Sequence, residues 1–342
     1  MKFLFLFITF CFLVSCDQSE KSHLYSSVTV DDVYQDSVSI RAIEIMNGSL
    51  AFAGSNGNFG SVDLSSNKVR TNIQIYDSIF PSFRAVGHTA TDFFMLSVAN
   101  PALLYKTGDS GQMELVYIEE GETVFYDSMT FWNNREGIAI GDSVDGCLSI
   151  IITRDGGTSW NKLPCEILPK AIIEEGAFAA SNTNVDVKGN KTWIATTGSR
   201  IYFSPDKGNT WEYVQTPVLG DGPTEGIYSI DFYDENIGFA FGGDFTKPEN
   251  NHANKAITLD GGKTWELIAN NQEPGYKSCV QFVPNGGGKD IVALGFTGIS
   301  YSKDMGSTWK QLSEEPFYTI RFLNDSIAYA AGKNRIAKLT FR

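Results

Sequence analysis

Short apolar stretches that end in glycine recur along the chain, and polar turns flank each of them. Examples are residues 51–54, 138–141, 239–242 and 328–332. Apolar runs of this length bounded by turn residues predict buried β-strands rather than helices. An alternating strand precedes each run and a further strand follows it. Four short strands in roughly 45 residues is the pattern of one blade of a β-propeller.

A turn motif marks the end of the third strand in each unit. Four segments share the pattern S/T-x-D-x-G-x-S/T-W, with aspartates at Asp155, Asp206, Asp260 and Asp304 and tryptophans at Trp160, Trp211, Trp265 and Trp309. Two weaker copies contain Asp63, without the Gly and Trp, and Asp109, with Glu114 where Trp is expected. The Asp side chain accepts backbone N–H bonds in a tight turn and the Gly supplies positive φ. The Trp opens the next strand and packs against the neighbouring blade.

The two ends of the chain predict how the ring closes. A last unit, residues 317–342, supplies three strands and stops where its outermost strand would begin, while residues 25–30 (YSSVTV) form a spare strand. Joining the two removes an exposed sheet edge. We therefore predict an all-β fold, a seven-bladed β-propeller over residues 25–342 that its N-terminal strand closes.

The turn motif resembles the Asp-box (BNR) repeat of sialidases, sortilin-type receptors and related propellers. Residues 39–42 (SIRA), 98–102 (VANPA), 141–146 (GDSVDG) and 242–248 (GGDFTKP) are similar to bacterial secreted propellers related to the photosystem II assembly and stability factor. That resemblance implies a seven-bladed propeller in the cell envelope. Such chains are often labelled oxidoreductases, but no GxGxxG, flavin or metal motif accompanies the resemblance here, so no cofactor is predicted.

The N-terminal sequence predicts where the protein is located. Lys2 precedes an apolar run, residues 3–14, which ends in Leu-Val-Ser-Cys at Cys16. The run is too short to span a bilayer and fits a secretory signal. It resembles the bacterial lipobox, so we predict a lipoprotein signal peptide over 1–15, acylation of Cys16 and a tether over 16–24. An ordinary signal peptide with an incidental Cys16 is the alternative.

The negative net charge argues against one class of binding partner. The chain has 27 Lys and Arg against 40 Asp and Glu, a formal net charge of −13. Phosphate backbones need a basic face, so the composition argues against nucleic acid. The predicted partner is an envelope protein, a peptide or a glycan, with the membrane reached only through the lipid anchor.

The innermost strands predict a ring of polar side chains at the mouth of the channel. Aligning these strands on buried residues places one side chain per blade there: Arg41, Arg84, Asp127, Thr183, Tyr228, Ser278 and Tyr318. Two interpretations remain open. The ring is either solvated and neutralised by Arg–Asp pairing, or it holds a small carboxylate-bearing ligand between two guanidinium groups.

The loops between the second and third strands lie at the end of the blades opposite the motif turns. We call this end, with the connections between blades, the B–C face. Long polar loops on a rigid scaffold favour binding. The candidates are Asn100, Asp142, Asp145, Asn182, Asn184, Asp244 and Lys247.

Two functions follow from these patterns. The first is a non-catalytic scaffold that binds its partner on the B–C face. The alternative is a sialidase-like or other glycoside hydrolase at the channel mouth, although Ala-Ile follows Arg41 and Ala-Val follows Arg84, so both lack the Pro of the sialidase F/Y-R-I-P motif. Adjacent glutamates such as Glu174 and Glu175 predict exposed loop charge rather than carboxylates facing each other across a cleft. The three histidines lack ligand spacing, so no metal site is predicted.

Cys147 and Cys165 flank one motif hairpin. Pairing Thr153 with Trp160 brings the two cysteines opposite each other across the third and fourth strands. An oxidising envelope would allow a cross-strand disulfide there. Unpaired buried thiols are the alternative.

Overall fold

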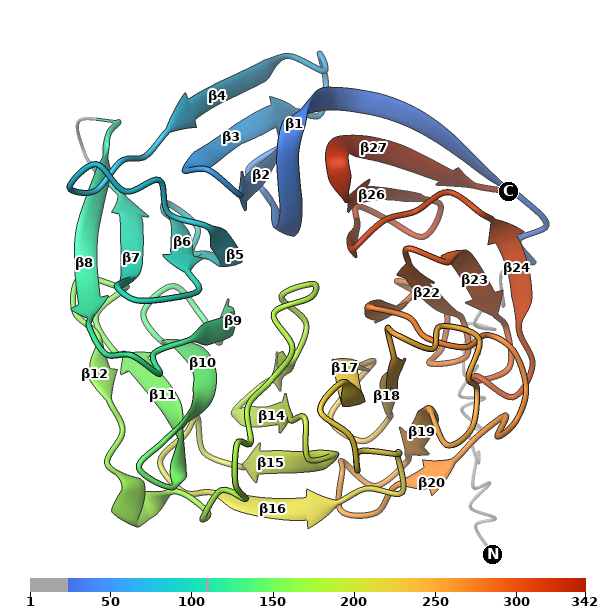
Figure 1. Cartoon of the computed structure of the whole chain (residues 1–342). Coiled ribbons are helices and arrows are strands. Elements are labelled where there is room, and N and C mark those ends of the chain that lie inside the picture. The colour runs from blue at the N-terminus through green and yellow to red at the C-terminus, as the bar shows by residue number, and fades with distance from the viewer. Residues whose placement is uncertain (1–23, 109–110) are drawn as a thin grey trace, which may run out of the picture.

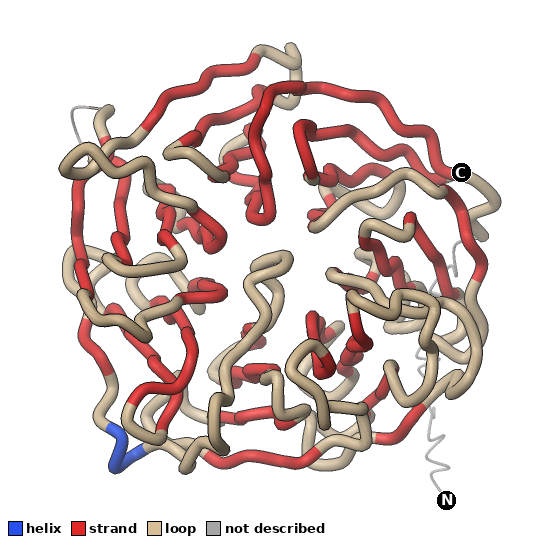
Figure 2. The backbone as a smooth tube through the Cα atoms, viewed as in Figure 1, coloured by secondary structure: helices blue, strands red, loops and turns tan. Residues whose placement is uncertain are grey.

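The computed structural model describes residues 24–108 and 111–342. The predicted signal peptide 1–15, Cys16, all but the last residue of the tether 16–24, and Asp109 lie outside these residues. Within them the strands form six antiparallel sheets arranged in a ring around a central axis (Figure 1). The one helical element in the described part of the chain is the 3₁₀ turn η1, Cys165–Ile167 (Figure 2).

Five sheets have four strands, each a meander in chain order. The first comprises β5 (Phe83–His88), β6 (Phe93–Ser97), β7 (Ala102–Thr107) and β8 (Met113–Glu119). The second comprises β9 (Tyr126–Phe131), β10 (Gly137–Val144), β11 (Cys147–Thr153) and β12 (Asn161–Lys162). The third comprises β13 (Val185–Lys188), β14 (Lys191–Ala195), β15 (Arg200–Ser204) and β16 (Glu212–Gln215). The fourth comprises β17 (Glu225–Phe232), β18 (Gly238–Asp244), β19 (Lys255–Thr258) and β20 (Glu266–Leu267). The fifth comprises β21 (Cys279–Phe282), β22 (Ile291–Gly295), β23 (Gly298–Ser302) and β24 (Lys310–Ser313).

The sixth sheet joins the two ends of the described chain. Its strand order is β25 (Thr319–Phe322), β26 (Ile327–Ala331), β27 (Lys333–Phe341), β1 (Val28–Met46), β2 (Ser49–Gly54), β3 (Asn58–Asp63) and β4 (Val69–Ile73). The first part of β1 pairs with β27 from Val28↔Phe341, and its last part pairs with β2 as far as Met46↔Ser49. The spare N-terminal strand therefore lies beside the C-terminal strand, as predicted. It differs in length, because it continues without a break into the next innermost strand (Figure 1).

The four complete motifs share one pattern of hydrogen bonds. In the first, the Asp155 carboxylate accepts from the backbone N–H of Ser159 at 3.0 Å and from its hydroxyl at 2.7 Å, while the Thr153 hydroxyl accepts from Gly157 N–H at 2.8 Å. Asp206, Asp260 and Asp304 make the equivalent bonds to Thr210, Thr264 and Thr308. Each turn thus satisfies backbone donors that a tight loop would leave exposed.

The core lies in layers between neighbouring sheets. Trp160 packs on Phe94 of the preceding sheet with ring centroids 6.2 Å apart, and Trp309 lies 5.9 Å from Phe239. Burying an aromatic side chain stabilises the fold by up to about 3 kcal/mol. The motif therefore fixes a turn and at the same time joins two sheets.

The structure contains a disulfide between Cys147 and Cys165, whose Cα atoms are 5.6 Å apart. This is the pair that the register argument predicts, and the observed register, Ile152↔Asn161, matches the predicted one. The local geometry differs, because β12 ends at Lys162 and Cys165 begins η1. The bridge therefore joins a strand to a 3₁₀ turn rather than two paired strands.

Candidate functional site

Four innermost strands carry a β-bulge at the same level of the channel. The extra residues are Arg41, Arg84, Asp127 and Tyr228, each skipped in the pairing of its strand with the next. For example, Ile40 pairs with Gly54 and Ala42 with Ala53, which leaves Arg41 unpaired. A bulge breaks the alternation of a strand and re-aims one side chain. Four of the seven predicted ring residues owe their orientation to this device.

A segment of the chain itself enters the channel. The connection from β12 to β13 reaches the axis as a narrow loop (Figures 1 and 2), and we call its residues 176–184 the plug segment. The Asn182 side chain accepts from Met129 N–H at 2.9 Å and donates to the Val86 carbonyl at 2.8 Å. The Ser181 carbonyl accepts from the Thr319 hydroxyl at 2.9 Å. These bonds tie the plug segment to β5, β9 and β25.

A buried ion pair holds the start of this segment. Glu175 is 1% exposed and accepts from Arg200 Nε at 2.9 Å, from the Tyr202 hydroxyl at 3.0 Å and from the Thr196 hydroxyl at 2.7 Å. The prediction of exposed loop charge is therefore wrong for Glu175, because a buried carboxylate needs such partners. Glu174 beside it is exposed, as predicted.

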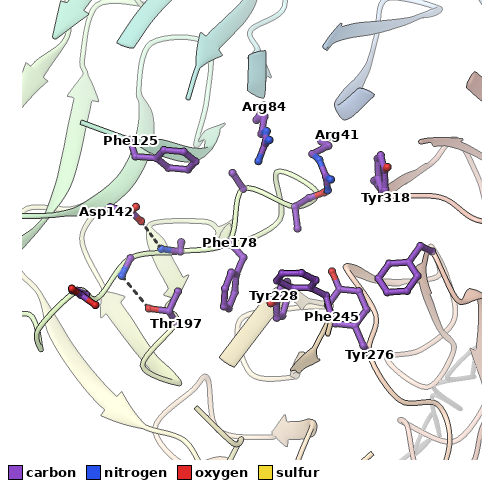
Figure 3. Close-up of a pocket in the computed structure, with 16 residues that line it drawn as sticks. Arg41, Arg84, Phe125, Asp142, Phe178, Thr197, Tyr228, Phe245, Tyr276 and Tyr318 are labelled. Atoms are coloured by element: carbon purple, nitrogen blue, oxygen red, sulfur yellow. Dashed lines mark hydrogen bonds between the residues drawn. The ribbon is translucent and has the colours of Figure 1, made fainter. Parts of the chain in front are cut away.

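The plug segment forms one side of a pocket of about 590 Å³ on the B–C face. Arg41, Arg84, Tyr228 and Tyr318 line this pocket (Figure 3). Asp142 and Glu174 also line it. The structure thus brings together four residues of the predicted ring and one of the predicted loop residues.

Aromatic side chains make up much of the remaining wall. Phe178 stacks on Tyr228 with ring centroids 3.8 Å apart and an interplanar angle of 1°. Tyr276 meets the edge of Tyr228 at 4.8 Å and contacts Phe296 at 5.2 Å. Stacked and edge-to-face contacts of this kind hold rings in one orientation. The wall is therefore largely preformed.

The two arginines lack carboxylate partners among the described residues. Arg41 donates to the Ala180 carbonyl at 3.4 Å, and its guanidinium lies 4.0 Å from the centroid of the Tyr318 ring. Neither Arg41 nor Arg84 lies within 4.0 Å of an acidic group in the described part of the chain. Burial and the nearby Arg41 lower the pKa of Arg84. The described residues therefore contain no direct Arg–Asp ion pair in this ring, which the first of the two interpretations requires.

Asp127 is buried and forms no ion pair with either arginine among the described residues. It is 0% exposed and lies beside Asp142, which accepts from Ala177 N–H at 3.2 Å (Figure 3). Burial and the neighbouring Asp142 raise the pKa of Asp127 well above its usual range. Burial also raises the pKa of Asp142 to about 6. Two carboxyl groups that share a buried site cannot both ionise easily.

The other two ring residues lie beneath the pocket. Thr183 is 6% exposed and its hydroxyl is 2.7 Å from that of Ser229. Ser278 is 2% exposed and donates to the Tyr318 carbonyl at 2.8 Å. They therefore do not line the pocket at the channel mouth: Thr183 belongs to the plug segment itself, and both side chains are buried.

The predicted loop residues have several different roles. Asn182 and Asn184 are 3% and 0% exposed and belong to the plug segment rather than to a loop between second and third strands. Asp244 is 1% exposed and caps its turn by accepting from Thr246 N–H at 2.9 Å. Asn100, Asp145 and Lys247 are exposed on their loops, with Lys247 3.3 Å from Asp244.

Sequence reasoning missed most of the aromatic wall. The missed residues are Phe125, Phe178, Phe245, Tyr276 and Phe296. Phe125 directly precedes β9, while Phe245 and Phe296 directly follow β18 and β22. A systematic search for aromatic residues at strand ends on the B–C face would have found these three.

Two negative findings concern the described residues. No group of three or more His, Cys, Asp or Glu side chains in residues 24–108 and 111–342 lies close enough together to hold a metal ion. In the same residues, no helix has the length and apolar character needed to cross a membrane.

Comparison with known proteins identifies the architecture. No protein-family model and no curated sequence matches the chain. The structure is similar to "YCF48 bound to D1 peptide", with a TM-score of 0.66 and 15% identity over 94% of this chain and 98% of that one. It is also similar to a streptogramin B lyase, with a TM-score of 0.69 and 14% identity over 94% and 100%. A GH74 enzyme from Niastella koreensis matches with a TM-score of 0.62 and 15% identity over 90% of this chain and 53% of that one.

These likenesses show that the chain has a β-propeller fold. They include a protein bound to a peptide as well as enzymes, so the fold alone does not choose between binding and catalysis.

Proposed function

We propose that this protein is a non-catalytic binding scaffold that takes a carboxylate-bearing peptide segment of a partner protein in the B–C face pocket. One observation carries the proposal: two guanidinium groups without carboxylate partners line an aromatic pocket. A carboxylate placed there would supply the missing counter-charge, and the rings would cover apolar parts of the same segment. The solved structure of YCF48 with a D1 peptide supports peptide binding by this fold.

Exposed apolar side chains support a macromolecular partner on this face. Large apolar side chains are exposed at the end of β4 and in the connections on this face: Ile73, Ile75, Ile79, Phe80, Ile167, Ile172, Ile173, Phe245 and Phe296. Ile173 is 94% exposed. Of these, Phe245 and Phe296 also line the pocket. Exposed apolar side chains on one face are typical of interaction surfaces.

We further propose that the ring has seven blades built on Asp-box repeats. The pairing of β1 with β27 and then with β2 supports this count, since it divides the seven-stranded sheet into two units that share one long strand. The common hydrogen bonds of the four motifs support the Asp-box assignment. We also propose that acylated Cys16 anchors the protein in the bacterial envelope, with the disulfide suited to an oxidising compartment.

A second candidate is glycoside hydrolysis, which the carboxyl pair favours. Asp142 faces the pocket with a pKa raised to about 6, which suits a general acid. Asp127, however, is fully buried and does not line the pocket. A glycosidase of the usual kind needs two carboxyl groups that both reach the scissile bond, so binding is the better-supported function.

The test is a peptide selection with matched arginine variants. Wild-type protein selects ligands from a random peptide library, and Arg41→Ala, Arg84→Ala and the control Arg135→Ala are then titrated with the selected peptides. Arg135 is exposed in the turn between β9 and β10. Charge-assisted hydrogen bonds contribute about 1.5–3 kcal/mol, so each pocket variant should weaken binding about ten- to a hundredfold.

The control variant should bind like the wild type. Equal affinities for all four proteins would refute the role of the two arginines. Hydrolysis of a glycan library by the wild type, lost in Asp142→Asn, would instead support the second candidate.

A further inference from the structure

The tryptophans of the repeated motif fill clefts between neighbouring sheets. Trp160 lies against Phe94, and Trp309 against Phe239 and Phe241 at 5.9 and 5.7 Å. Trp265 packs in one cluster with Trp193, also of the preceding sheet. On this side of the ring, which we call the motif face, an indole is thus the normal occupant of the cleft between two sheets.

The sheet β5–β8 lacks this indole. Thr107 opens its weak motif and pairs with Met113. In the complete motifs the corresponding residue pairs with the tryptophan, as the register Ile152↔Asn161 sets Thr153 opposite Trp160. Met113 therefore occupies the tryptophan position, and the expectation of Glu114 from spacing is wrong because this turn is one residue shorter.

A pocket opens where the indole is missing. Its volume is about 480 Å³, and it lies between the sheet containing β1–β4 and the sheet β5–β8. Met46, Phe59, Phe93 and Met113 are among its apolar lining residues. Arg70 lines it from an exposed position on β4 and has no ion-pair partner among the described residues.

These features match a planar aromatic group. A dry apolar cavity of about 150 Å³ is enough to bind benzene, so the volume admits an indole. Methionine thioethers make favourable contacts with aromatic rings. An exposed guanidinium at the edge of such a site stacks on a ring face. A bound indole would restore the packing that the protein has in its other clefts.

We propose that this cleft binds the tryptophan side chain of a partner protein, at a second site on the motif face. The site is separate from the B–C face pocket and does not depend on its function. Its specificity would come from shape, because a flat indole fills the cleft as Trp160, Trp265 and Trp309 fill theirs.

The test uses N-acetyltryptophanamide as the probe and the methyl groups of methionine as reporters. The protein with ¹³C-methyl methionine is titrated by NMR. Binding should shift the Met46 and Met113 methyl signals through the ring current, saturably, while Met305 on the far side of the ring stays unchanged. Absence of saturable shifts at both Met46 and Met113 would overturn the proposal.

Two substitutions on one strand give the matched comparison. Met113→Trp should fill the cleft from within, raise the unfolding temperature and abolish the probe-induced shift at Met46. Glu114→Trp, at the exposed neighbouring position, should leave both the shift and the unfolding temperature as in the wild type. Probe binding that survives in folded Met113→Trp, or is lost equally in both variants, contradicts the proposal.

A surface substitution keeps the test valid if Met113→Trp does not fold. Arg70→Ala should weaken binding of the probe about two- to fivefold, as expected for an exposed cation–π contact. Arg135→Ala is the control and should have no effect. Equal probe affinity in Arg70→Ala and wild type would show that Arg70 does not contact the bound indole. The wild-type shifts at Met46 and Met113 would then decide whether the cleft binds the probe.

Discussion

Replacing Asn182 with alanine tests whether specific hydrogen bonds hold the plug segment in the channel. The change removes one acceptor and one donor, and so leaves the Met129 N–H and the Val86 carbonyl unpaired in a buried site. Each orphaned group costs about 1–3 kcal/mol. Asn182 also has a φ of 60°, where alanine costs roughly 1 kcal/mol more. We expect the free energy of unfolding to fall by about 3–7 kcal/mol.

The assay is equilibrium urea unfolding followed by tryptophan fluorescence. Asn56→Ala is the matched control, because Asn56 has a similar φ of 58° but is exposed and uses its side chain in no buried hydrogen bond. The control should lose only about 1 kcal/mol, the cost of the left-handed backbone. The difference between the two variants isolates the contribution of the buried bonds.

The same variant should also weaken the B–C face pocket. The plug segment supplies Ala177–Ala180 to that pocket, so a loosened segment would lower affinity for the peptides selected by the wild type. A loss of unfolding free energy no larger than that of Asn56→Ala would refute the account of how the channel is closed.

Two further predictions concern the buried carboxyl pair and the disulfide. Burial raises the pKa of Asp142 from 3.8 to about 6 and also raises that of Asp127. The folded protein therefore holds protons that the unfolded chain releases, so stability falls as pH rises from about 4 through 6. Asp127→Asn should therefore flatten this pH dependence in urea unfolding from pH 4.5 to 7.5, because it removes one of the two carboxyl groups whose raised pKa causes it. The exposed control Asp145→Asn should keep the wild-type dependence, and an unchanged slope in Asp127→Asn would contradict the assignment. Replacing both Cys147 and Cys165 with serine should lower the free energy of unfolding by about 3 kcal/mol, as expected for a loop of this size. Equal unfolding midpoints with and without the bridge would contradict this stabilising role.

The strands were predictable because their signals are local. Apolar runs ending in glycine mark the second strand of several units, and the complete motifs mark the turn after the third strand in four of them. The pairing of β1 with β27 followed from counting strands at the two ends. The disulfide followed from the turn alone, since a tight turn sets the register of both flanking strands.

The site was predictable only in part because it depends on non-local features. Arg41, Arg84, Tyr228 and Tyr318 were found by alignment, but the bulges that direct three of them leave no mark in the residue pattern. The plug segment has no periodicity, and its entry into the channel rests on contacts such as Asn182 with Val86, far away in sequence. The role of Met113 was not predicted because Thr107 and Met113 are one residue closer in sequence than Thr153 and Trp160. Counting along the motif therefore points to Glu114 instead of Met113.

The most direct test of the central claim is the affinity of one selected peptide before and after its carboxylates are converted to amides. Calorimetric titration measures both forms against the wild type and against the double variant Arg41→Ala, Arg84→Ala. The account predicts that conversion weakens wild-type binding at least tenfold and changes binding to the double variant less than about twofold, since the paired charges are then already absent. Equal loss of affinity in the two proteins would show that the arginines do not bind the peptide carboxylates, and would contradict the proposed function.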